Sequence, residues 1–184
     1  KSDGKNGHTF FRREMLDAST RKVEIEHSLH LALARGELEM YYQPQIDINT
    51  THLIGAEALM RWNHPVRGLL SAGEFLPFAE ENGLIIALSD WMLDSICRDL
   101  LVWNAIGPER MRLSINLSPQ YLDRGDFFGK LDAALSSHGI DPSQIEVEVT
   151  ENICIRNPDS AISQLERLAQ LGVRVAIDDF GTGY

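Results

Sequence analysis

The sequence has little cysteine, a shortage of basic residues and no long apolar run. Its two cysteines, Cys97 and Cys154, lie far apart and outside any CxxC spacing, which argues against a disulfide framework or a zinc knuckle. No stretch reaches the roughly 18 apolar residues of a membrane span, and no signal-peptide pattern is present. Lys and Arg number 17 against 27 Asp and Glu, and the net charge of −10 argues against general affinity for duplex nucleic acid. We therefore expect a cytoplasmic location, with membrane attachment of the parent protein through other regions left open.

Charge and helix signals divide the 184 residues near Gly36. Residues 1–36 carry a net charge of +2 and residues 37–184 a net charge of −12. Residues 1–10 resemble a turn or the end of a preceding domain. Apolar residues at helical spacing then predict a linking helix over 11–36, which Gly36 would end. The remaining domain is expected to occupy residues 37–184.

Residues 37–184 alternate between β-rich and helix-forming segments. The expected strands are 39–46, 54–59, 112–117, 145–150 and 173–178, and the expected helices are 72–81, 84–105, 127–138 and 159–171. A repeated strand–helix rhythm predicts parallel strands with helices outside them, and the first strand precedes this rhythm and is a candidate antiparallel strand. The sequence therefore predicts an α/β protein.

Polar residues recur on one face of these strands, near their carboxyl ends. This placement is the active-site end of a (β/α) barrel. Three carboxylates that converge without neutralisation repel one another, and one of them would take up a proton. A set of carboxylate oxygens with one amide is typical of Mg²⁺, Mn²⁺ or Ca²⁺ sites and not of zinc sites. The alternative is that these are edge strands with a solvated polar face. The residues in question are Glu57, Asn116, Glu148 and Asp178, with Asp179 next to the last.

Four ordered motifs carry a resemblance to the EAL domain family. They are EALMRW at 57–62, NLS at 116–118, EVTE at 148–151 and DDFGTG at 178–183. The resemblance implies a (β/α)8 TIM-type barrel, of which about the first five strands are present here. It also implies hydrolysis of cyclic di-GMP to linear pGpG with Mg²⁺ or Mn²⁺. The segment KSDGKNG at 1–7 is similar to the tail of a GGDEF domain, which implies a cyclase-type domain upstream in the parent chain.

The resemblance also implies roles for individual residues. Metal coordination falls to Glu57, Asn116, Glu148 and Asp178, and Asp179 would help to bind a second metal ion bridged by Asp178. Of these, Glu57, Asp178 and Asp179 are the catalytic candidates. Gln43 and Arg61 would contact the ligand phosphates, and Leu59 would pack against a guanine. Glu151 and the loop 179–184 would couple the metal site to a dimer interface.

The part of the family pattern beyond the Gly-rich loop is absent from the chain. That part supplies the activating Lys and further ligands, and a closed barrel typically needs roughly 250 residues, whereas residues 37–184 number 148. We therefore expect weak or no turnover from this segment alone, and pairing of its open sheet edges in a homodimer, including a domain-swapped one. Two alternatives stay open: a non-catalytic cyclic di-GMP receptor that signals through the linking helix, and an unrelated Mg²⁺-dependent barrel.

Overall fold

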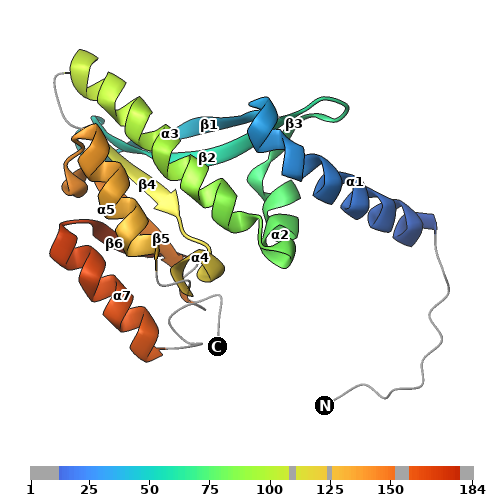
Figure 1. The fold of residues 1–184 in the computed structure, drawn as a ribbon. Helices are drawn as coiled ribbons and strands as arrows, with labels where there is room; N and C mark the ends of the chain where they lie inside the picture. Colours follow the sequence, from blue (N-terminus) through green and yellow to red (C-terminus); the bar gives the residue numbers. More distant parts are fainter. Residues whose placement is uncertain (1–12, 108–110, 124–125, 152–157, 179–184) are drawn as a thin grey trace.

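A mixed six-stranded sheet forms the centre of the molecule (Figure 1). The structure, a computed structural model, describes residues 13–107, 111–123, 126–151 and 158–178. The strand order is β1-β2-β4-β5-β6, and β3 pairs with β2. Strands β2, β4, β5 and β6 run parallel, and β1 and β3 pair with β2 in the antiparallel sense, so the antiparallel first strand is confirmed. The strands are β1 (Leu38–Ile46), β2 (Leu53–His64), β3 (Gly68–Ser71), β4 (Arg112–Asn116), β5 (Ile145–Thr150) and β6 (Arg174–Asp178).

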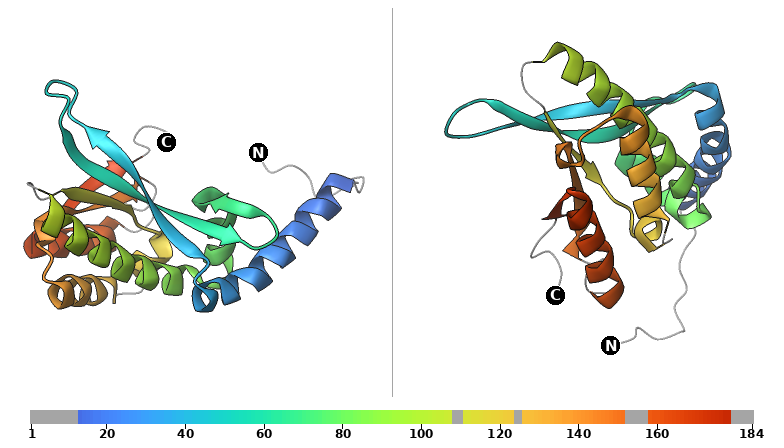
Figure 2. Two further views of the ribbon diagram at one scale, coloured as in Figure 1. Left: turned by 90° about the horizontal axis from the view of Figure 1, so that it is seen from above. Right: turned by 60° about the vertical axis from the view of Figure 1, so that its left-hand side comes forward.

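Helices cover one face of this sheet. Helices α3, α5 and α7 lie side by side along it, whereas α1 extends away from the sheet beside α2 (Figures 1 and 2). None of the helices in the described ranges has the length and hydrophobicity needed to cross a bilayer. The bounds are α1 (Arg13–Arg35), α2 (Ala72–Asn82), α3 (Ile85–Ile106), α4 (Pro119–Asp123), α5 (Phe127–His138) and α7 (Pro158–Leu171), with a 3-10 turn η1 (Pro142–Gln144).

Local sequence signals set the helix ends. Ser71 and Glu74 form a reciprocal capping box at the start of α2, which satisfies backbone N–H groups that the first helical turn leaves without partners. Gly36, Gly139 and Gly172 follow α1, α5 and α7 with φ of 65°, 64° and 96°. These left-handed conformations are the ones for which glycine is favoured after a helix. Within the described residues the predicted helix ends are confirmed to within two residues, whereas the predicted start of the linking helix at residue 11 lies outside them, and β3 and α4 were not expected.

The core lies between the helices and the facing side of the strands. On β2, Ala56, Ala58, Met60 and Trp62 are buried in alternation with half-buried polar or larger residues. Trp62 is fully buried, packs edge-on against Phe75 at 5.7 Å between ring centroids, and donates from Nε1 to Glu37 Oε2 at 3.0 Å. A buried indole N–H needs such a partner because an unpaired donor keeps its full desolvation cost. This contact ties β2 to the α1–β1 junction.

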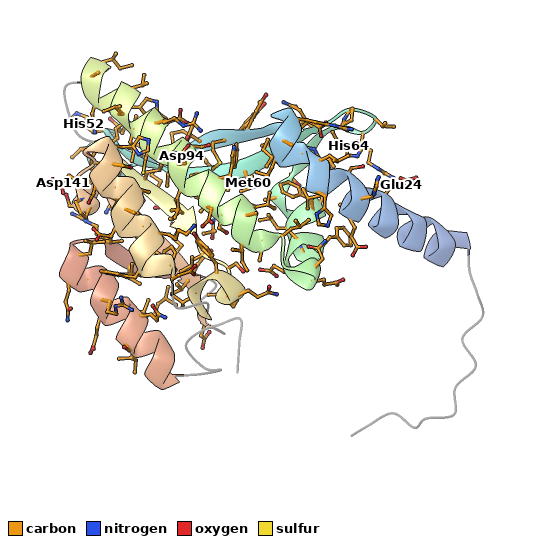
Figure 3. The ribbon with its side chains drawn as sticks, in the orientation of Figure 1. Glu24, His52, Met60, His64, Asp94 and Asp141 are labelled. Carbon is orange, nitrogen blue, oxygen red and sulfur yellow. The ribbon has the colours of Figure 1, made fainter. Side chains whose placement is uncertain are left out.

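The last part of α1 docks against the domain through apolar side chains. Ile25, Leu29 and Ala32 are fully buried, and α1 contacts α2 along this stretch. Arg67, in the turn between β2 and β3, pairs with Glu24 on α1. Figure 3 shows Glu24 and His64, the last residue of β2, on the same side of the molecule and far from His52. The end of the predicted linking helix is therefore part of the folded domain.

The hairpin between β1 and β2 turns on Asp47. Its Oδ1 accepts hydrogen bonds from the backbone N–H of Asn49 at 2.9 Å and of Thr50 at 2.8 Å. The hydrogen bonds from Thr50 lower the pKa of Asp47, so the ionised form is the one that stabilises this turn. A carboxylate in this position replaces a backbone turn hydrogen bond.

We expect the variant Asp47→Ala to speed amide hydrogen exchange at Asn49 and Thr50. Because the folded pKa is lowered, the contribution of Asp47 is present above the unfolded pKa of about 3.9 and is lost as the pH falls through the folded value. The difference between the variant and the wild type is therefore largest near neutral pH and shrinks below about pH 4. Exchange rates measured by NMR across this range check the result, and an equal difference at pH 3 and pH 7 would contradict it.

Cys97 on α3 is fully buried, and burial raises the pKa of its thiol to about 11. We expect the native protein to react slowly with a thiol reagent at pH 8, because the thiolate is the reactive form. The variant Cys154→Ser isolates Cys97 for this measurement, and addition of urea should release the reaction. Rapid labelling of the folded variant would contradict the prediction.

Candidate functional site

The face of the sheet opposite the helices carries most of the candidate residues, and we call it the polar face. It is formed by the side chains that alternate along each strand with those directed toward the helices: Glu39, Tyr41 and Gln43 on β1, Glu57, Leu59 and Arg61 on β2, Ser114 and Asn116 on β4, Glu146, Glu148 and Thr150 on β5, and Ala176 and Asp178 on β6. The strand registers place Asn116 beside Glu148 and Thr150 beside Asp178. Residues far apart in the sequence therefore lie on neighbouring strands.

Glu57 and Asn116 are in direct contact. The Asn116 Nδ2 donates to Glu57 Oε1 at 2.7 Å, although the two residues belong to β2 and β4. The sequence predicted that Glu57 lies near the end of its strand. This is wrong, because β2 continues to His64 in antiparallel pairing with β1 and β3. Its parallel pairing with β4 nevertheless covers only Gly55–Ala58, so Glu57 lies where the parallel part of the sheet ends.

Negative charges concentrate around Glu148. Its pKa is raised, chiefly by burial and further by the neighbouring charges of Glu57, Asp178 and Glu146, although a hydrogen bond from Ser114 acts in the opposite direction. Such a shift means that the ionised carboxylate is disfavoured in its present surroundings. A bound cation would remove this penalty, because it compensates the carboxylates that repel one another.

A polar network lies below these residues, toward the amino ends of the strands. Arg112 pairs with Glu146 at 3.3 Å, and the fully buried Ser114 donates to Glu146 Oε1 at 3.1 Å. Gln45 of β1 donates to Ser114 Oγ at 3.4 Å. The sequence left the role of Glu146 open, and the structure places it in an ion pair below the carboxylates. The sequence could not assign this role to Glu146, because it does not give the register that places Arg112 and Ser114 of β4 next to Glu146 of β5.

The three residues expected to contact ligand lie on β1 and β2. Gln43 is the cross-strand partner of Glu57, and Leu59 and Arg61 follow Glu57 on the same face of β2. Gln43 is exposed, whereas Leu59 and Arg61 are half-buried. All three are therefore on the polar face and next to the carboxylate and amide groups.

The candidates near the chain end are placed only in part. Asp178 ends β6, is exposed, and contributes to the negative surroundings of Glu148. Glu151 follows β5 directly and is half-buried. Asp179 and the loop 179–184 lie outside the described residues. The predicted second metal position and the coupling role of Glu151 thus stay predictions.

An apolar cavity of about 200 Å³ opens beside the candidate residues, and sequence reasoning missed it. Asn116, Glu148 and Thr150 border it on the side of the strands. Its remaining walls come from β2, α2, α3 and the segment after β4, namely Met60, Leu76, Glu80, Ile85, Ser89, Met92, Leu117, Ser118 and Pro119. Sequence patterns gave no sign of this cavity, because elements distant along the chain combine to form it.

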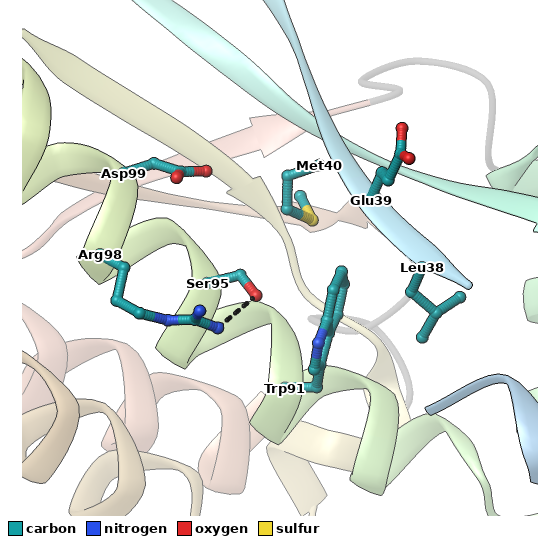
Figure 4. A pocket seen from close by; sticks show the side chains of 7 residues that line it. All are labelled: Leu38, Glu39, Met40, Trp91, Ser95, Arg98 and Asp99. Atoms are coloured by element: carbon teal, nitrogen blue, oxygen red, sulfur yellow. Dashed lines mark hydrogen bonds between the residues drawn. The ribbon is translucent and has the colours of Figure 1, made fainter. Parts of the chain in front are cut away.

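A second cavity, of about 470 Å³, lies between β1 and α3 on the helix-covered side (Figure 4). Trp91 and Met40 face it, and the Arg98 guanidinium donates to Ser95 along its wall. None of the candidate site residues lines this cavity. It is therefore separate from the candidate site residues, although Glu39 of the polar face is among the residues that line it.

The donor set fits a hard divalent cation. Glu57, Glu148 and Asp178 supply carboxylate oxygens and Asn116 an amide oxygen, and burial with mutual repulsion makes compensation by a cation favourable. Within the described ranges, no three His, Cys, Asp or Glu side chains lie close enough together to hold a metal ion by themselves. The described carboxylates therefore do not form a compact metal site on their own, and the role of Asn116 as a further ligand stays a prediction.

The fold and site define a class: a mixed α/β barrel-type protein with an oxygen-rich candidate metal site at the carboxyl ends of parallel strands. Residues 26–184 match the family model of the EAL domain, and the chain belongs to the EAL domain family. The family model begins within α1, in agreement with the docking of that helix.

Two relatives from Pseudomonas aeruginosa match the whole chain. It is 38% identical to the bifunctional diguanylate cyclase/cyclic di-GMP phosphodiesterase MucR and 40% identical to the cyclic di-GMP phosphodiesterase NbdA. The match covers 27% of MucR and 24% of NbdA, so the chain spans about a quarter of the length of these relatives.

Solved structures agree with the fold. A MucR phosphodiesterase in complex with c-di-GMP superimposes with a TM-score of 0.84 at 39% identity, over 88% of this chain and 65% of that chain. The EAL enzyme Bd1971, bound to cAMP and cyclic di-GMP, gives a TM-score of 0.83 at 28% identity, over 94% of this chain and 49% of that one. The predicted fold class, a partial TIM-type EAL barrel, is confirmed.

Proposed function

We propose that the protein containing this chain hydrolyses cyclic di-GMP to linear pGpG in a metal-dependent reaction. The observation that carries the proposal is the convergence of Glu57, Asn116 and Glu148 on one face of the sheet, with the cationic Arg61 two positions beyond Leu59 on the same strand. A ligand with two phosphodiesters and two bases requires cationic, metal-binding and apolar groups, and the described residues supply all three. The c-di-GMP complex of the MucR phosphodiesterase supports the ligand assignment.

Each group has a distinct part in the proposed reaction. Glu57, Asn116, Glu148 and Asp178 would hold Mg²⁺ or Mn²⁺, which, when bound, polarises a phosphodiester and lowers the pKa of water. Gln43 and Arg61 would orient the phosphates by charge-assisted hydrogen bonds. The oxygen of a water molecule forms a new bond to phosphorus while the bond from phosphorus to the ribose 3′ oxygen breaks. The water loses a proton, and the ribose 3′ oxygen takes one up. One phosphodiester is opened and no other reactant is consumed.

The bases would meet apolar surface on both sides of the metal ligands. Leu59 offers a half-buried side chain on β2, and the 200 Å³ cavity borders Asn116 and Glu148 on the other side. Ser89 and Glu80 at this cavity could supply the few polar contacts that orient a guanine. We propose one base near Leu59 and the other toward the cavity.

Further parts of the proposal concern assembly. The relative MucR is named as bifunctional, with diguanylate cyclase activity, which supports a GGDEF-type domain upstream of α1. The boundaries 1–10, 11–36 and 37–184 are part of this proposal, with the last part of the linking helix, from Ile25 on, packed into the folded domain. Among the described strands, β1, β3 and β6 each pair with one neighbour only, and unpaired edges favour a homodimer. Light scattering during size-exclusion chromatography measures that association.

The test is an assay of the parent protein with cyclic di-GMP and Mg²⁺ or Mn²⁺, followed by chromatography of the products. We expect pGpG, and we expect chelation by EDTA to abolish its formation. Binding of cyclic di-GMP without turnover would favour a non-catalytic receptor. Neither binding nor turnover would overturn the proposed substrate.

A further inference from the structure

Tyr41 lies on the polar face among the residues proposed to contact the ligand, although no motif singles it out. Its strand register pairs it with Leu59, and its neighbour on the same face of β1 is Gln43. The side chain is 44% exposed, which is unusual for so large an apolar ring in a sheet. Tyr41 therefore presents ring surface where Gln43, Leu59 and Arg61 meet.

The Tyr41 ring also contacts the Arg61 guanidinium. The Arg61 Cζ lies over the ring at 5.7 Å from its centroid, within the range of a cation–π interaction. In addition, Arg61 Nη1 donates to the backbone carbonyl of Met60 at 2.9 Å. The contact with the Tyr41 ring and the hydrogen bond to Met60 together restrain the orientation of the guanidinium.

Arg61 keeps donors for a ligand in this arrangement. A guanidinium has five N–H donors in a planar fork, which matches a phosphate group. In the part of the chain that the structure describes, Arg61 pairs with no carboxylate, even though Glu39 is its cross-strand neighbour and Glu57 lies on the same strand. A contact with a neutral ring restrains the guanidinium without neutralising it or occupying its donors.

We propose that Tyr41 is a positioning residue, which holds the Arg61 guanidinium in the orientation that receives a phosphate of the cyclic dinucleotide. The inference rests on the proposed function, because that function supplies the phosphate. Tyr41 acts through its ring, and its hydroxyl is not required. The preorganised arginine then binds phosphate without first losing rotamer freedom.

The test compares Tyr41→Phe with Tyr41→Leu in the full parent protein. Cyclic di-GMP binding is measured by calorimetry after EDTA treatment, and kcat and KM are measured with Mg²⁺. We expect Tyr41→Phe to bind like the wild type and Tyr41→Leu to bind about three- to tenfold more weakly. The same loss should appear as a higher KM with kcat changed less than twofold, since the metal ligands are untouched.

A double-mutant cycle with Arg61→Gln separates positioning from a merely structural effect. If Tyr41 acts through Arg61, then Tyr41→Leu weakens binding no further once Arg61 has been replaced. Additive losses in the double variant would overturn the inference, as would unchanged binding by Tyr41→Leu. If Tyr41→Leu does not fold, Tyr41→Gln replaces it in the cycle, and thermal unfolding verifies each variant. Absence of binding by the wild type would instead overturn the proposed function.

Discussion

Replacement of Glu148 by Gln should lower the rate of cyclic di-GMP hydrolysis by about a thousandfold in the parent protein. A bound divalent ion contributes several kcal/mol to the transition state of phosphodiester cleavage, and each 1.36 kcal/mol is about a tenfold change in rate. The substitution removes one anionic ligand and keeps the size of the side chain. Initial rates with Mg²⁺ or Mn²⁺ measure the loss, and calorimetric titration with Mn²⁺ should show weaker metal binding.

The same variant should lose activity but gain thermal stability in the absence of metal. Without metal, Glu148 is disfavoured as a carboxylate by burial and by Glu57 and Asp178, so Glu148→Gln should raise the melting temperature of the EDTA-treated protein. Glu146→Gln is the matched control on the same face of β5. It weakens the ion pair with Arg112 and should lower stability by about 1 kcal/mol. Hydrolysis by Glu148→Gln within tenfold of the wild type would contradict the assignment of Glu148 as a ligand.

Replacement of Trp62 by Ala should destabilise the domain by about 4 kcal/mol, the cost typical of removing a large buried aromatic residue. Trp62 is fully buried, packs against Phe75, and donates its indole N–H to Glu37. The substitution therefore creates a cavity and leaves the Glu37 carboxylate without this donor. Urea unfolding of the parent protein, followed by circular dichroism, measures the loss.

Trp91→Ala is the control for this prediction. Trp91 is only half-buried and lines the cavity between β1 and α3, so its removal enlarges an existing space (Figure 4). We expect it to cost about 1.5 kcal/mol. Equal losses for the two variants would contradict the view that Trp62 is the anchor of this part of the core.

Alternation in the sequence predicted much of the sheet and its two faces. Glu146, Glu148 and Thr150 alternate with buried residues on β5, and this pattern is visible without a structure. Strand β3 was missed because its four residues, Gly68–Ser71, are too few to show a period. Its pairing with the second half of β2 is also what extends β2 beyond the predicted end.

The candidate site was predicted as a set of residues and not as a geometry. The motifs indicated Glu57 and Asn116 separately, but the 2.7 Å contact between them depends on the register of β2 and β4. The role of Glu146 depends in the same way on Arg112, which lies on the neighbouring strand. Tyr41 carries no sequence signal of its own, since its contact with Arg61 arises from antiparallel pairing. Long-range register is the information that local patterns lack.

The division of β2 into two faces has a consequence for how this domain tolerates change. Ala56, Ala58, Met60 and Trp62 determine stability, whereas Glu57, Leu59 and Arg61 belong to the candidate site. A saturation-mutagenesis library scored separately for abundance and for catalysis should therefore give two interleaved profiles along this strand, offset by one residue. Substitutions at the candidate site residues of β2 can then remove activity, while the buried residues of the same strand continue to stabilise the fold.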